Sequence, residues 1–311
     1  MAFALETTFM SLSTYEVIIV GGSYAGLSAA LALGRSLRRT LIIDGGDPCN
    51  KSAPVTHNFI THDGDDPAEV ARLAREQVLA YDTVRLVEDL ATDLTGEDGA
   101  FTMTTKAGST YAARKILFAT GLHDQLPAIP GIQECWGKSV IHCPYCHGYE
   151  VRRQPTGILM NNDHTLDMVN LIRNWTDDLT LFTNGPASVA SEDIRATGTK
   201  LVEQPIDHLL HDGGQLRGVC LTDGTEIDLR ALYLHPILTQ KCPLPEAIGC
   251  ELEPNGTIKV DEFRMTTVPG IYAAGDCTTH MRAVSYATGM GTLTGAMVNR
   301  GLVLDACAVN S

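Results

Sequence analysis

Residues 16–26 read EVIIVGGSYAG, and this stretch decides the fold. Its first five residues form a nearly continuous apolar run, which is typical of a strand buried in a parallel sheet. An amphipathic helix is predicted directly after the glycines, and residues 40–43 (TLII) form a second apolar run that closes on Asp44. Strand, glycine turn, helix and strand in this order predict a Rossmann-like α/β unit.

The glycine turn itself predicts a bound dinucleotide. Gly21 permits the turn, Gly26 lets the helix approach the strand, and backbone N–H groups at the helix start can hold a pyrophosphate. Asp44 lies 23 residues after Gly21, where a carboxylate can accept hydrogen bonds from a ribose. Ser23 stands where a glycine is usual, so the prediction depends on the strand, the helix and Asp44 as well as on the glycines.

The order of elements repeats in the middle of the chain. Residues 156–160 (TGILM) predict a strand, residues 165–175 a helix and residues 179–182 (LTLF) another strand. This repetition indicates a duplicated architecture. The chemistry is not duplicated, because residues 160–163 (MNND) replace the glycine turn and no arginine follows Phe182 to bind a phosphate.

The last part of the chain returns to the pattern of the first. An apolar strand ends in Gly275-Asp276, and a glycine-rich helix follows from about Ala283. We therefore expect an α/β protein of two Rossmann-like domains. The expected first domain is built from residues 1–122 and 246–311, and the expected central domain from residues 123–245.

Length and composition limit the possible functions. The 311 residues (33.5 kDa) suffice for two domains with separate cores, and no apolar run approaches the length of a membrane span. The net charge of −14 and the pI near 5.0 argue against nucleic acids and anionic membranes as partners. Residues 1–14 lack the features of a signal peptide, so we expect a loose extension, with Met10 as an alternative start, and a cytoplasmic protein.

Between the two predicted folds lies the stretch HCPYCHG, residues 142–148. Cys143 and Cys146 are separated by two residues, so they can form a disulfide within one turn. A neighbouring positive charge or a helix N-terminus lowers the pKa of such a thiol into the reactive range. A dithiol of this kind takes up two electrons and passes them on by thiolate attack on another disulfide.

Three other interpretations compete for this stretch. The string C-x-x-C-H is that of c-type haem attachment, which would require an export signal. A zinc half-site would need a second half from Cys242 and Cys250, whose spacing fits no common zinc motif. An inert buried pair is the third. The redox interpretation is preferred because of the nucleotide folds on either side. The remaining cysteines are interpreted as small core residues: Cys49, Cys135, Cys220, Cys242, Cys250, Cys277 and Cys307.

Taken together, these residues resemble the thioredoxin reductase family of flavoproteins over nearly the whole chain. The resemblance is carried by residues 21–26 with Asp44, by Ala119-Thr120-Gly121, by Cys143-Pro144-Tyr145-Cys146 and by residues 271–276 (IYAAGD). It implies two Rossmann-like domains of the three-layer ββα type, FAD in the first fold and a homodimer. The FAD-binding residues that it implies are Gly21, Gly22, Ser23, Ala25, Gly26, Asp44, Gly45, Asn58, Thr120, Gly121, Gly275, Asp276, Ala283 and Val284.

The resemblance also implies roles at the redox pair. Cys146 corresponds to the thiol that touches the flavin, and Cys143 to the thiol that attacks the partner disulfide. His147 stands in the place of the family's acid/base, and a histidine, with an unperturbed pKa of about 6.5, can bring a proton to a leaving thiolate.

The second fold departs from the NADPH-using members of this family. Those members carry Gly-x-Gly-x-x-Ala and an arginine-rich loop, whereas Met160 and Asn162 fall on the glycine positions here and the loop reads Thr183-Asn184-Gly185. We expect the Met160 side chain to fill the space where a pyrophosphate must approach the backbone. NADPH is therefore not expected to bind productively.

Two branches of the family fit a protein of this kind. Ferredoxin-dependent flavin thioredoxin reductases pass electrons from ferredoxin to FAD, to the Cys143–Cys146 disulfide and then to thioredoxin, and this branch is preferred. Ferredoxins are acidic, so a local basic patch of Arg152, Arg153 and Arg173 would have to overcome the net charge. Dithiol oxidases of the gliotoxin type run the reaction backwards and give electrons to oxygen. A flavin-bound redox sensor is the non-enzymatic alternative.

Overall fold

The computed structural model describes residues 13–309. The expected N-terminal extension, with Met10, lies outside the described residues apart from its last two, which begin the first strand. The described chain forms two compact units. Unit 1 contains residues 13–48, 71–122 and 240–309, and unit 2 contains residues 49–70 and 123–239. These units differ from the expected domain segments at residues 49–70 and 240–245.

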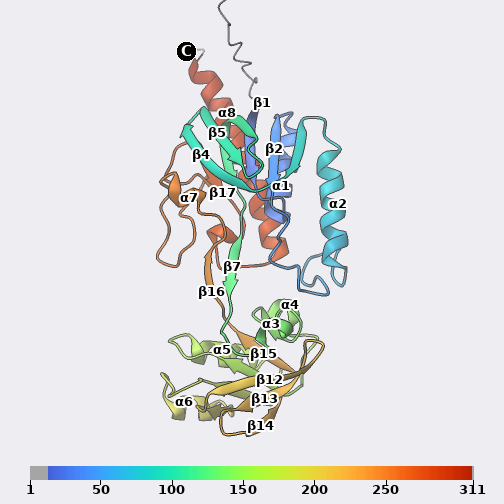
Figure 1. The fold of residues 1–311 in the computed structure, drawn as a ribbon, viewed down its shortest axis with the longest axis vertical. Coiled ribbons are helices and arrows are strands. Elements are labelled where there is room, and N and C mark those ends of the chain that lie inside the picture. Colours follow the sequence, from blue (N-terminus) through green and yellow to red (C-terminus); the bar gives the residue numbers. More distant parts are fainter. Residues whose placement is uncertain (1–12, 310–311) are drawn as a thin grey trace, which may run out of the picture. The chain divides into compact units, whose positions relative to one another are not determined.

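Unit 1 is built on a mostly parallel sheet with strand order β3-β2-β1-β6-β5-β4, in which β17 also pairs with β6 (Figure 1). The register places Val17 opposite both Thr40 and Lys115. Its strands are β1 (Ser13–Val20), β2 (Thr40–Asp44), β3 (Val84–Glu88), β4 (Ala91–Glu97), β5 (Ala100–Thr105), β6 (Thr110–Phe118) and β17 (Ile271–Ala273). Its helices are α1 (Tyr24–Arg35), most of α2 (Pro67–Leu79), α7 (Leu244–Ala247), the 3-10 helix η1 (Asp276–Thr278) and α8 (Val284–Val309).

Helix α1 packs closely along α8, which comes from the other end of the chain. A Cβ on Gly291 would lie 2.2 Å from the carbonyl oxygen of Ala25, and one on Gly295 would lie 2.6 Å from that of Ala29. Both positions of α8 therefore require glycine, and the close approach fixes the N-terminal end of α1.

Unit 2 repeats the parallel arrangement in a smaller sheet with strand order β11-β10-β9-β15-β8. Its parallel strands are β8 (Val140–Ile141), β9 (Thr156–Leu159), β10 (Leu179–Phe182), β11 (Lys200–Val202) and β15 (Ala231–Leu234). An antiparallel sheet of β12 (Ile206–Asp212), β13 (Gln215–Leu221) and β14 (Glu226–Asp228) packs on it through a shared apolar core. Its helices are α3 (Ile132–Cys135), α4 (Pro144–His147), α5 (Thr165–Ile172) and α6 (Ser191–Ala196). The paired strands β7 (Leu122–Gln125) and β16 (Ile237–Gln240) carry the chain from one unit to the other.

The two parallel sheets confirm the predicted α/β fold with Rossmann-like elements. The duplication extends to individual hydrogen bonds, since Gly21 N–H donates to Ile43 O at 2.8 Å and Met160 N–H donates to Phe182 O at 3.1 Å. Met160 therefore occupies in the second fold the place that Gly21 occupies in the first.

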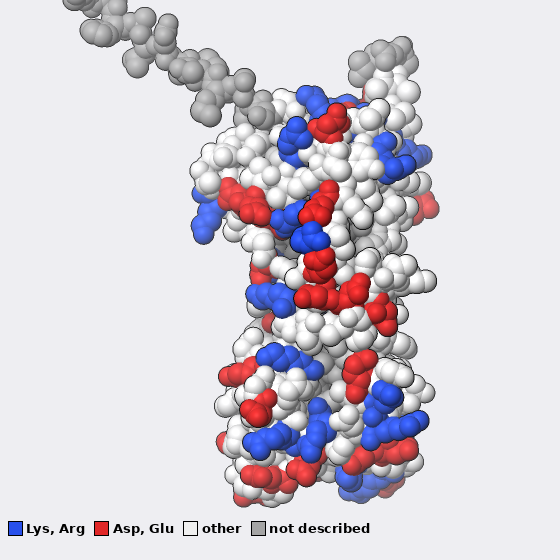
Figure 2. All heavy atoms as spheres, turned by 90° about the vertical axis from the view of Figure 1, so that its right-hand side faces the viewer, with Lys and Arg blue, Asp and Glu red and all other residues white. Residues whose placement is uncertain are grey.

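The described surface has a mixed charge distribution. Basic and acidic side chains alternate over the face shown in Figure 2, although the chain as a whole carries a net charge of −14. Among residues 13–309, no helix is long and apolar enough to cross a membrane.

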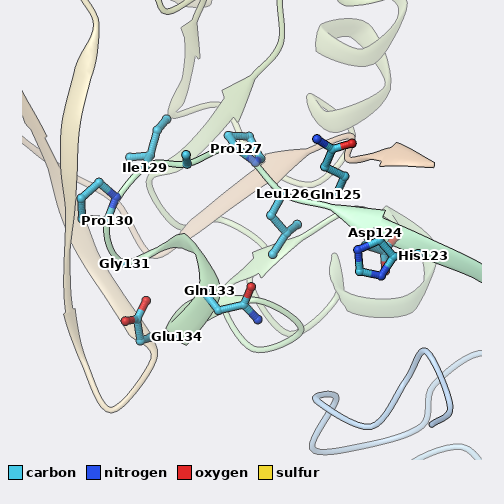
Figure 3. Close-up of a pocket in the computed structure, with 11 residues that line it drawn as sticks. His123, Asp124, Gln125, Leu126, Pro127, Ile129, Pro130, Gly131, Gln133 and Glu134 are labelled. Atoms are coloured by element: carbon cyan, nitrogen blue, oxygen red, sulfur yellow. The ribbon is translucent and has the colours of Figure 1, made fainter. Parts of the chain in front are cut away.

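A cavity of about 580 Å³ lies in unit 2 along the segment from His123 to Glu134. Its lining comes from this single segment, at the end of β7 and the start of α3 (Figure 3). None of the predicted catalytic or cofactor-binding residues lines this cavity, so the candidate site is formed by other parts of the chain.

Candidate active site

The glycine turn after β1 has the tight geometry that its sequence predicts. Gly21 has a φ of +108°, and a Cβ on it would lie 2.3 Å from the carbonyl oxygen of Ala119. A Cβ on Gly26 would lie 1.9 Å from the carbonyl oxygen of Gly21. Only glycine fits either position. The first N–H groups of a helix bind anions, so the turn and the start of α1 fit the pyrophosphate of a dinucleotide.

Asp44 is held at the end of β2 by two partners. The N–H of Gly22 donates to its Oδ1 at 3.0 Å, and the guanidinium of Arg75 lies 3.1 Å from its Oδ2. Arg75 comes from α2 and also pairs with Glu88 at 2.8 Å. The carboxylate thus faces the glycine turn, as a ribose contact requires. Sequence reasoning did not find Arg75, because a charged residue on an amphipathic helix carries no signal of its partner.

Residues from the far part of the chain lie against the same turn. Gly275 has a φ of +78°, and a Cβ on it would lie 2.8 Å from the Cβ of Ala25. Thirteen of the predicted cofactor residues belong to unit 1: Gly21, Gly22, Ser23, Ala25, Gly26, Asp44, Gly45, Thr120, Gly121, Gly275, Asp276, Ala283 and Val284.

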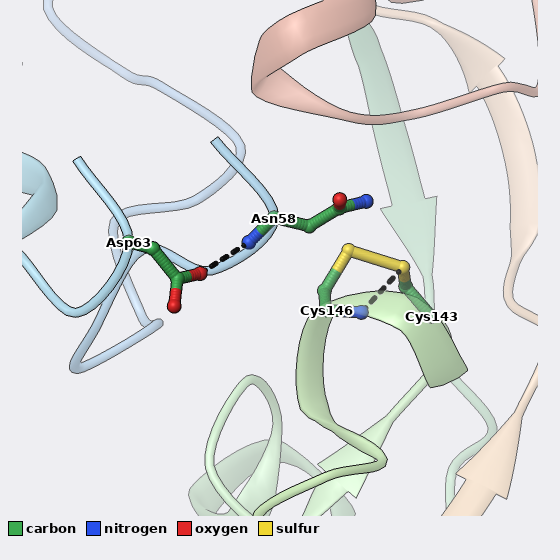
Figure 4. The surroundings of a disulfide bond; sticks show 4 residues. All are labelled: Asn58, Asp63, Cys143 and Cys146. Atoms are coloured by element: carbon green, nitrogen blue, oxygen red, sulfur yellow. Dashed lines mark hydrogen bonds between the residues drawn. A yellow bond between two sulfur atoms is a disulfide. The ribbon is translucent and has the colours of Figure 1, made fainter. Parts of the chain in front are cut away.

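The remaining predicted cofactor residue, Asn58, groups with unit 2. Its φ is +57°, and its N–H donates to Asp63 Oδ1 at 2.8 Å. Its side chain lies alongside the Cys143–Cys146 disulfide in Figure 4. The contact of Asn58 with FAD stays a prediction, and within unit 2 this residue belongs to the surroundings of the redox pair.

Cys143 and Cys146 are joined by a disulfide at the start of α4, with their Cα atoms 5.3 Å apart. Cys143 is the N-cap residue, and its Sγ accepts a hydrogen bond of 3.2 Å from the N–H of Cys146 (Figure 4). Pro144 follows at the first helical position, where its missing N–H costs nothing. Both cysteines are half-buried and therefore accessible from one side. An N–H donor of this kind stabilises the thiolate that forms when the disulfide opens.

The arrangement of the other cysteines does not support the zinc interpretation. Cys250 is buried in the apolar core of unit 1, and Cys242 packs against that core. Within the described part of the chain, no group of three or more His, Cys, Asp and Glu side chains could hold a metal ion.

His147 ends α4 directly after the redox pair. Burial lowers its pKa from the ordinary value of 6.5, the charge of Glu150 acts in the opposite direction, and the charge of His57 lowers the pKa further. The net lowering keeps the imidazole neutral at neutral pH, so it can accept a proton from a thiol and return it to a thiolate.

A second histidine, His57, lies close to this helix. Its Nδ1 is 3.4 Å from Asp63 Oδ1, and its Nε2 is 3.5 Å from Glu150 Oε1. Sequence reasoning did not identify His57, Asp63 or Glu150, because residues 57 and 150 are far apart in the sequence and match no spacing rule.

Aromatic side chains surround the exposed side of α4. The ring of Tyr145 is 64% exposed and meets Trp175 edge-on, with 5.8 Å between centroids. Tyr149 is 66% exposed, and the guanidinium of Arg152 lies 3.7 Å from its ring centroid. These groups form an accessible surface next to the disulfide.

The turn after β9 is closed by its own side chains, unlike the turn after β1. Asn162 N–H donates to Thr165 Oγ1 at 2.9 Å, and His164 N–H donates to Asn162 Oδ1 at 2.9 Å. Asn161 bonds across to the loop after β10, donating to Pro186 O at 2.9 Å and accepting from Ser188 N–H at 2.7 Å. Two of the N–H groups that a pyrophosphate would need are therefore already satisfied.

The expectation that the Met160 side chain blocks the pyrophosphate space was wrong. Its side chain is only 6% exposed and packs in the apolar core of unit 2. It does not fill the phosphate space. The threonine at the position of Gly26 closes the turn instead, since the Thr165 hydroxyl accepts the N–H of Asn162.

Comparisons with known proteins agree with this geometry. The sequence profile of the pyridine nucleotide-disulphide oxidoreductase family matches residues 15–164 and 187–291. The protein named thioredoxin reductase tcpT from Claviceps purpurea (strain 20.1) is 32% identical over 304 residues, which are 93% of this chain and 95% of that protein. Thioredoxin reductase aclD from Aspergillus oryzae is 30% identical over 95% of this chain and 99% of its own length. The crystal structure of an oxidoreductase from Agrobacterium tumefaciens matches with a TM-score of 0.89 at 35% identity, covering 94% of this chain and 99% of that one.

Proposed function

We propose, from the premise that this chain belongs to the pyridine nucleotide-disulphide oxidoreductase family, that it exchanges electrons with a thiol partner through Cys143 and Cys146. The chain is an FAD-dependent disulfide oxidoreductase of the thioredoxin reductase type. The disulfide that begins α4, next to a neutral His147, carries the proposal.

The residues of this chain support a complete thiol–disulfide exchange. In the reducing direction the neutral His147 first takes the proton of the Cys143 thiol. The Cys143 thiolate then attacks one sulfur of a partner disulfide, and the partner's second sulfur leaves and receives that proton from His147. The Cys146 thiol next gives its proton to His147, and its thiolate attacks Cys143 Sγ, which reforms the Cys143–Cys146 disulfide. The partner's remaining sulfur leaves and receives this second proton, so the partner is released as a dithiol. FAD, when bound, supplies the two electrons that open the disulfide, or accepts them in the opposite direction.

We propose that the electron donor is not a pyridine nucleotide. The closed turn at Asn162 and Thr165 supports this, because its N–H groups are used internally. Thr183 and Asn184 follow β10, so there is no acidic residue in the place that Asp44 has in the first fold. A nucleotide bound at this turn would find no carboxylate for its ribose, and the N–H groups of Asn162 and His164 that its pyrophosphate needs are already used.

Thioredoxin is the partner we propose, since the relatives from Claviceps purpurea and Aspergillus oryzae are named thioredoxin reductases. The exposed Tyr145 and Tyr149 offer a docking surface for a protein. For the donor, the sequence resemblance favours ferredoxin. The proposed basic patch is weaker than expected, because Arg173 pairs with Asp177 at 3.4 Å and Arg152 lies over Tyr149.

A dithiol oxidase is the second candidate, and the charge distribution favours it. The net charge of −14 and the weak basic patch oppose the docking of an acidic ferredoxin. A small dithiol needs no such patch. In this direction His147 accepts the proton of the attacking substrate thiol, and oxygen is the final electron acceptor.

We also propose that the protein is a homodimer. Helix α8 carries partly exposed apolar side chains along its length, with Tyr286 37%, Leu293 38%, Val303 45% and Leu304 52% exposed. Burial of such a face is favourable in a dimer. Light scattering coupled to size-exclusion chromatography tests this, and a mass near 33.5 kDa at micromolar concentration would contradict it.

Anaerobic titration of the yellow protein separates these possibilities. NADPH, NADH, reduced ferredoxin and a small dithiol are added in turn, and the flavin absorbance is followed. Bleaching by reduced ferredoxin, followed by thioredoxin reduction, supports the first candidate. Bleaching by the dithiol alone, with peroxide formed in air, supports the oxidase. Bleaching by micromolar NADPH contradicts the proposal about the second fold.

A further inference from the structure

We propose that Trp175 is a positioning residue of the redox pair, which holds the single turn of α4 so that the N–H of Cys146 stays directed at the Sγ of Cys143. The inference rests on the proposed function and deepens it, because it names the side chain that keeps one of the two sulfurs reactive. All the residues involved belong to unit 2.

The redox turn is too short to be stable without support from other residues. Helix α4 is a single turn of four residues. The N–H of His147 donates to Cys143 O at 3.2 Å, and the N–H of Gly148 donates to Pro144 O at 2.8 Å. Forming an isolated helical turn costs more backbone entropy than its first hydrogen bonds return. The disulfide adds a covalent closure, but this closure is lost when the pair is reduced.

The indole of Trp175 packs directly on the end of α4. A Cβ on Gly148 would lie 2.8 Å from Trp175 Nε1, 3.0 Å from its Cδ1 and 2.4 Å from the carbonyl oxygen of Pro144. Gly148 has a φ of −66°, which any residue adopts, so its backbone conformation does not require glycine. Lack of space excludes a side chain at this position, and the indole occupies part of that space.

Trp175 makes a second contact with the same turn. The ring of Tyr145, the residue directly before Cys146, lies edge-on to the indole with 5.8 Å between centroids and 86° between the ring planes. Edge-to-face is a preferred arrangement of aromatic pairs. Tyr145 is 64% exposed, whereas Gly148 is buried. The indole therefore contacts α4 on either side of Cys146 in the sequence.

Trp175 is itself fixed by the backbone around it. Its N–H donates to Ile172 O at 2.9 Å, at the end of α5, and its carbonyl oxygen accepts the N–H of Arg153 at 2.8 Å. The hydroxyl of the next residue, Thr176, donates to Gln154 O at 2.8 Å. Ile172 is fully buried in the core of unit 2. The half-buried indole is therefore anchored to that core as well as to the turn that it supports.

This support matters most after the disulfide has opened. The hydrogen bond from Cys146 N–H to Cys143 Sγ is 3.2 Å long in the closed pair (Figure 4). In the reduced pair the N–H keeps this direction only while the turn keeps its shape, and a donor to the sulfur favours the thiolate over the thiol. Opening the disulfide takes up two electrons and two protons, none of which passes through Trp175. Its role is geometric.

The test measures the Cys143 thiol in the FAD-containing protein, without turnover. Cys146→Ser leaves the peptide N–H at position 146 in place, and alkylation of Cys143 by iodoacetamide is followed from pH 5 to 10 in this background. Adding Trp175→Ala should raise the Cys143 pKa by about half to one unit and slow alkylation at neutral pH by about three- to tenfold. Trp175→Phe keeps an aromatic ring next to Tyr145 and should stay within about twofold of the parent.

Leu171→Ala is the matched control. Leu171 is an apolar side chain on α5 that is 37% exposed and lies four residues before Trp175. Its removal should leave the alkylation profile unchanged. None of these substitutions changes a charge, so a shift in the Cys143 pKa cannot come from a lost ionic contact. Flavin content and urea unfolding are recorded for every variant.

A second readout reports on the hydrogen bond itself. The amide at position 146 is followed by ¹H–¹⁵N NMR while Cys143 is titrated. An N–H that donates to the sulfur changes its shift strongly as the thiolate forms. This response should be lost in Trp175→Ala and kept in Trp175→Phe and Leu171→Ala. A variant that is merely less stable would keep the response in its folded population.

Equal Cys143 pKa values in the parent and in Trp175→Ala overturn the inference, and so does an equally large shift in Leu171→Ala. If Trp175→Ala does not fold, Tyr145→Ala decides, because Tyr145 is an exposed side chain that supplies one of the two contacts. Slowing of about twofold supports the inference, and an unchanged rate overturns it. The proposed function is tested separately by flavin bleaching in the wild-type protein. A redox-inactive wild type in which Trp175 still controls the Cys143 thiol would contradict the function and leave the positioning role standing.

Discussion

The N–H of Cys146 donates a 3.2 Å hydrogen bond to the Sγ of Cys143, so the first turn of α4 holds one sulfur of the pair as its cap. The two cysteines are therefore not equivalent. Cys143 has a donor ready for the negative charge of a thiolate, which favours a thiolate at Cys143 over one at Cys146.

Single serine variants should reveal this difference. With Cys146→Ser, Cys143 should be alkylated faster at neutral pH than Cys146 is in Cys143→Ser, by about tenfold for each unit of pKa difference. Both variants should keep FAD and lose all electron transfer to a partner. Mass spectrometry of the alkylated peptide and the flavin spectrum are the measurements. Equal alkylation rates, or transfer that survives in either variant, would contradict the assignment.

Gly26→Ala should weaken FAD binding. The new Cβ would lie 1.9 Å from the Gly21 carbonyl oxygen, so the turn must move. Overpacking of this kind costs about 1–3 kcal/mol, which corresponds to roughly 5- to 150-fold weaker binding. Flavin content after purification measures it. Gly289→Ala is the control, since its Cβ meets nothing within 4 Å, and it should keep FAD.

The pH dependence should follow the lowered pKa of His147. A step that needs the neutral imidazole should remain fast below pH 6.5, and fall only as pH drops through the lower folded value. Because the unfolded chain binds this proton more readily, the stability contribution is complete above pH 6.5 and is lost as pH falls below it. Rapid-mixing rates and urea titrations between pH 5 and 8 measure both effects. In His147→Asn the acidic limb of the rate profile should disappear; an unchanged limb would exclude His147.

Lys115→Met should destabilise unit 1 markedly. The ammonium is 3% exposed, between Asp98 Oδ1 at 2.6 Å and Asp305 Oδ2 at 2.9 Å. The loss should be about 1–3 kcal/mol, because Asp98, itself 36% exposed, is left without its cation while Asp305 keeps Arg114 at 3.3 Å. Lys259→Met removes an exposed pair with Glu251 and should cost about 0–1 kcal/mol. Urea unfolding of both variants measures the contrast, and equal losses would contradict it.

The sequence was sufficient to predict those parts of the fold and of the site whose geometry is determined by a single short stretch of residues. Residues 16–26 with Asp44 predicted the turn of unit 1, and the C-x-x-C spacing predicted a disulfide that the structure contains. The sequence also indicated that the turn after β9 differs from the glycine turn after β1. It did not reveal how, because Met160 turns into the core and Thr165 closes the turn through a contact that no pattern encodes.

The sequence was insufficient to predict contacts of the site between residues that lie far apart along the chain. His57 and Glu150 meet only after the chain has folded, and Arg75 reaches Asp44 from another element. Arg173 had the charge expected of a docking patch, but its neighbour Asp177 pairs with it. Pairings of this kind are set by tertiary packing, which composition and periodicity do not report.

The contact between α1 and α8 has a consequence for synthesis of the protein. These helices come from opposite ends of the described chain and meet where Gly291 approaches Ala25. During synthesis, the glycine turn after β1 therefore lacks its supporting helix until residues 284–309 have been translated. Unit 2 lies between α1 and α8 in the sequence and is translated earlier than α8, so the redox pair can reach its native surroundings before FAD has a finished binding site.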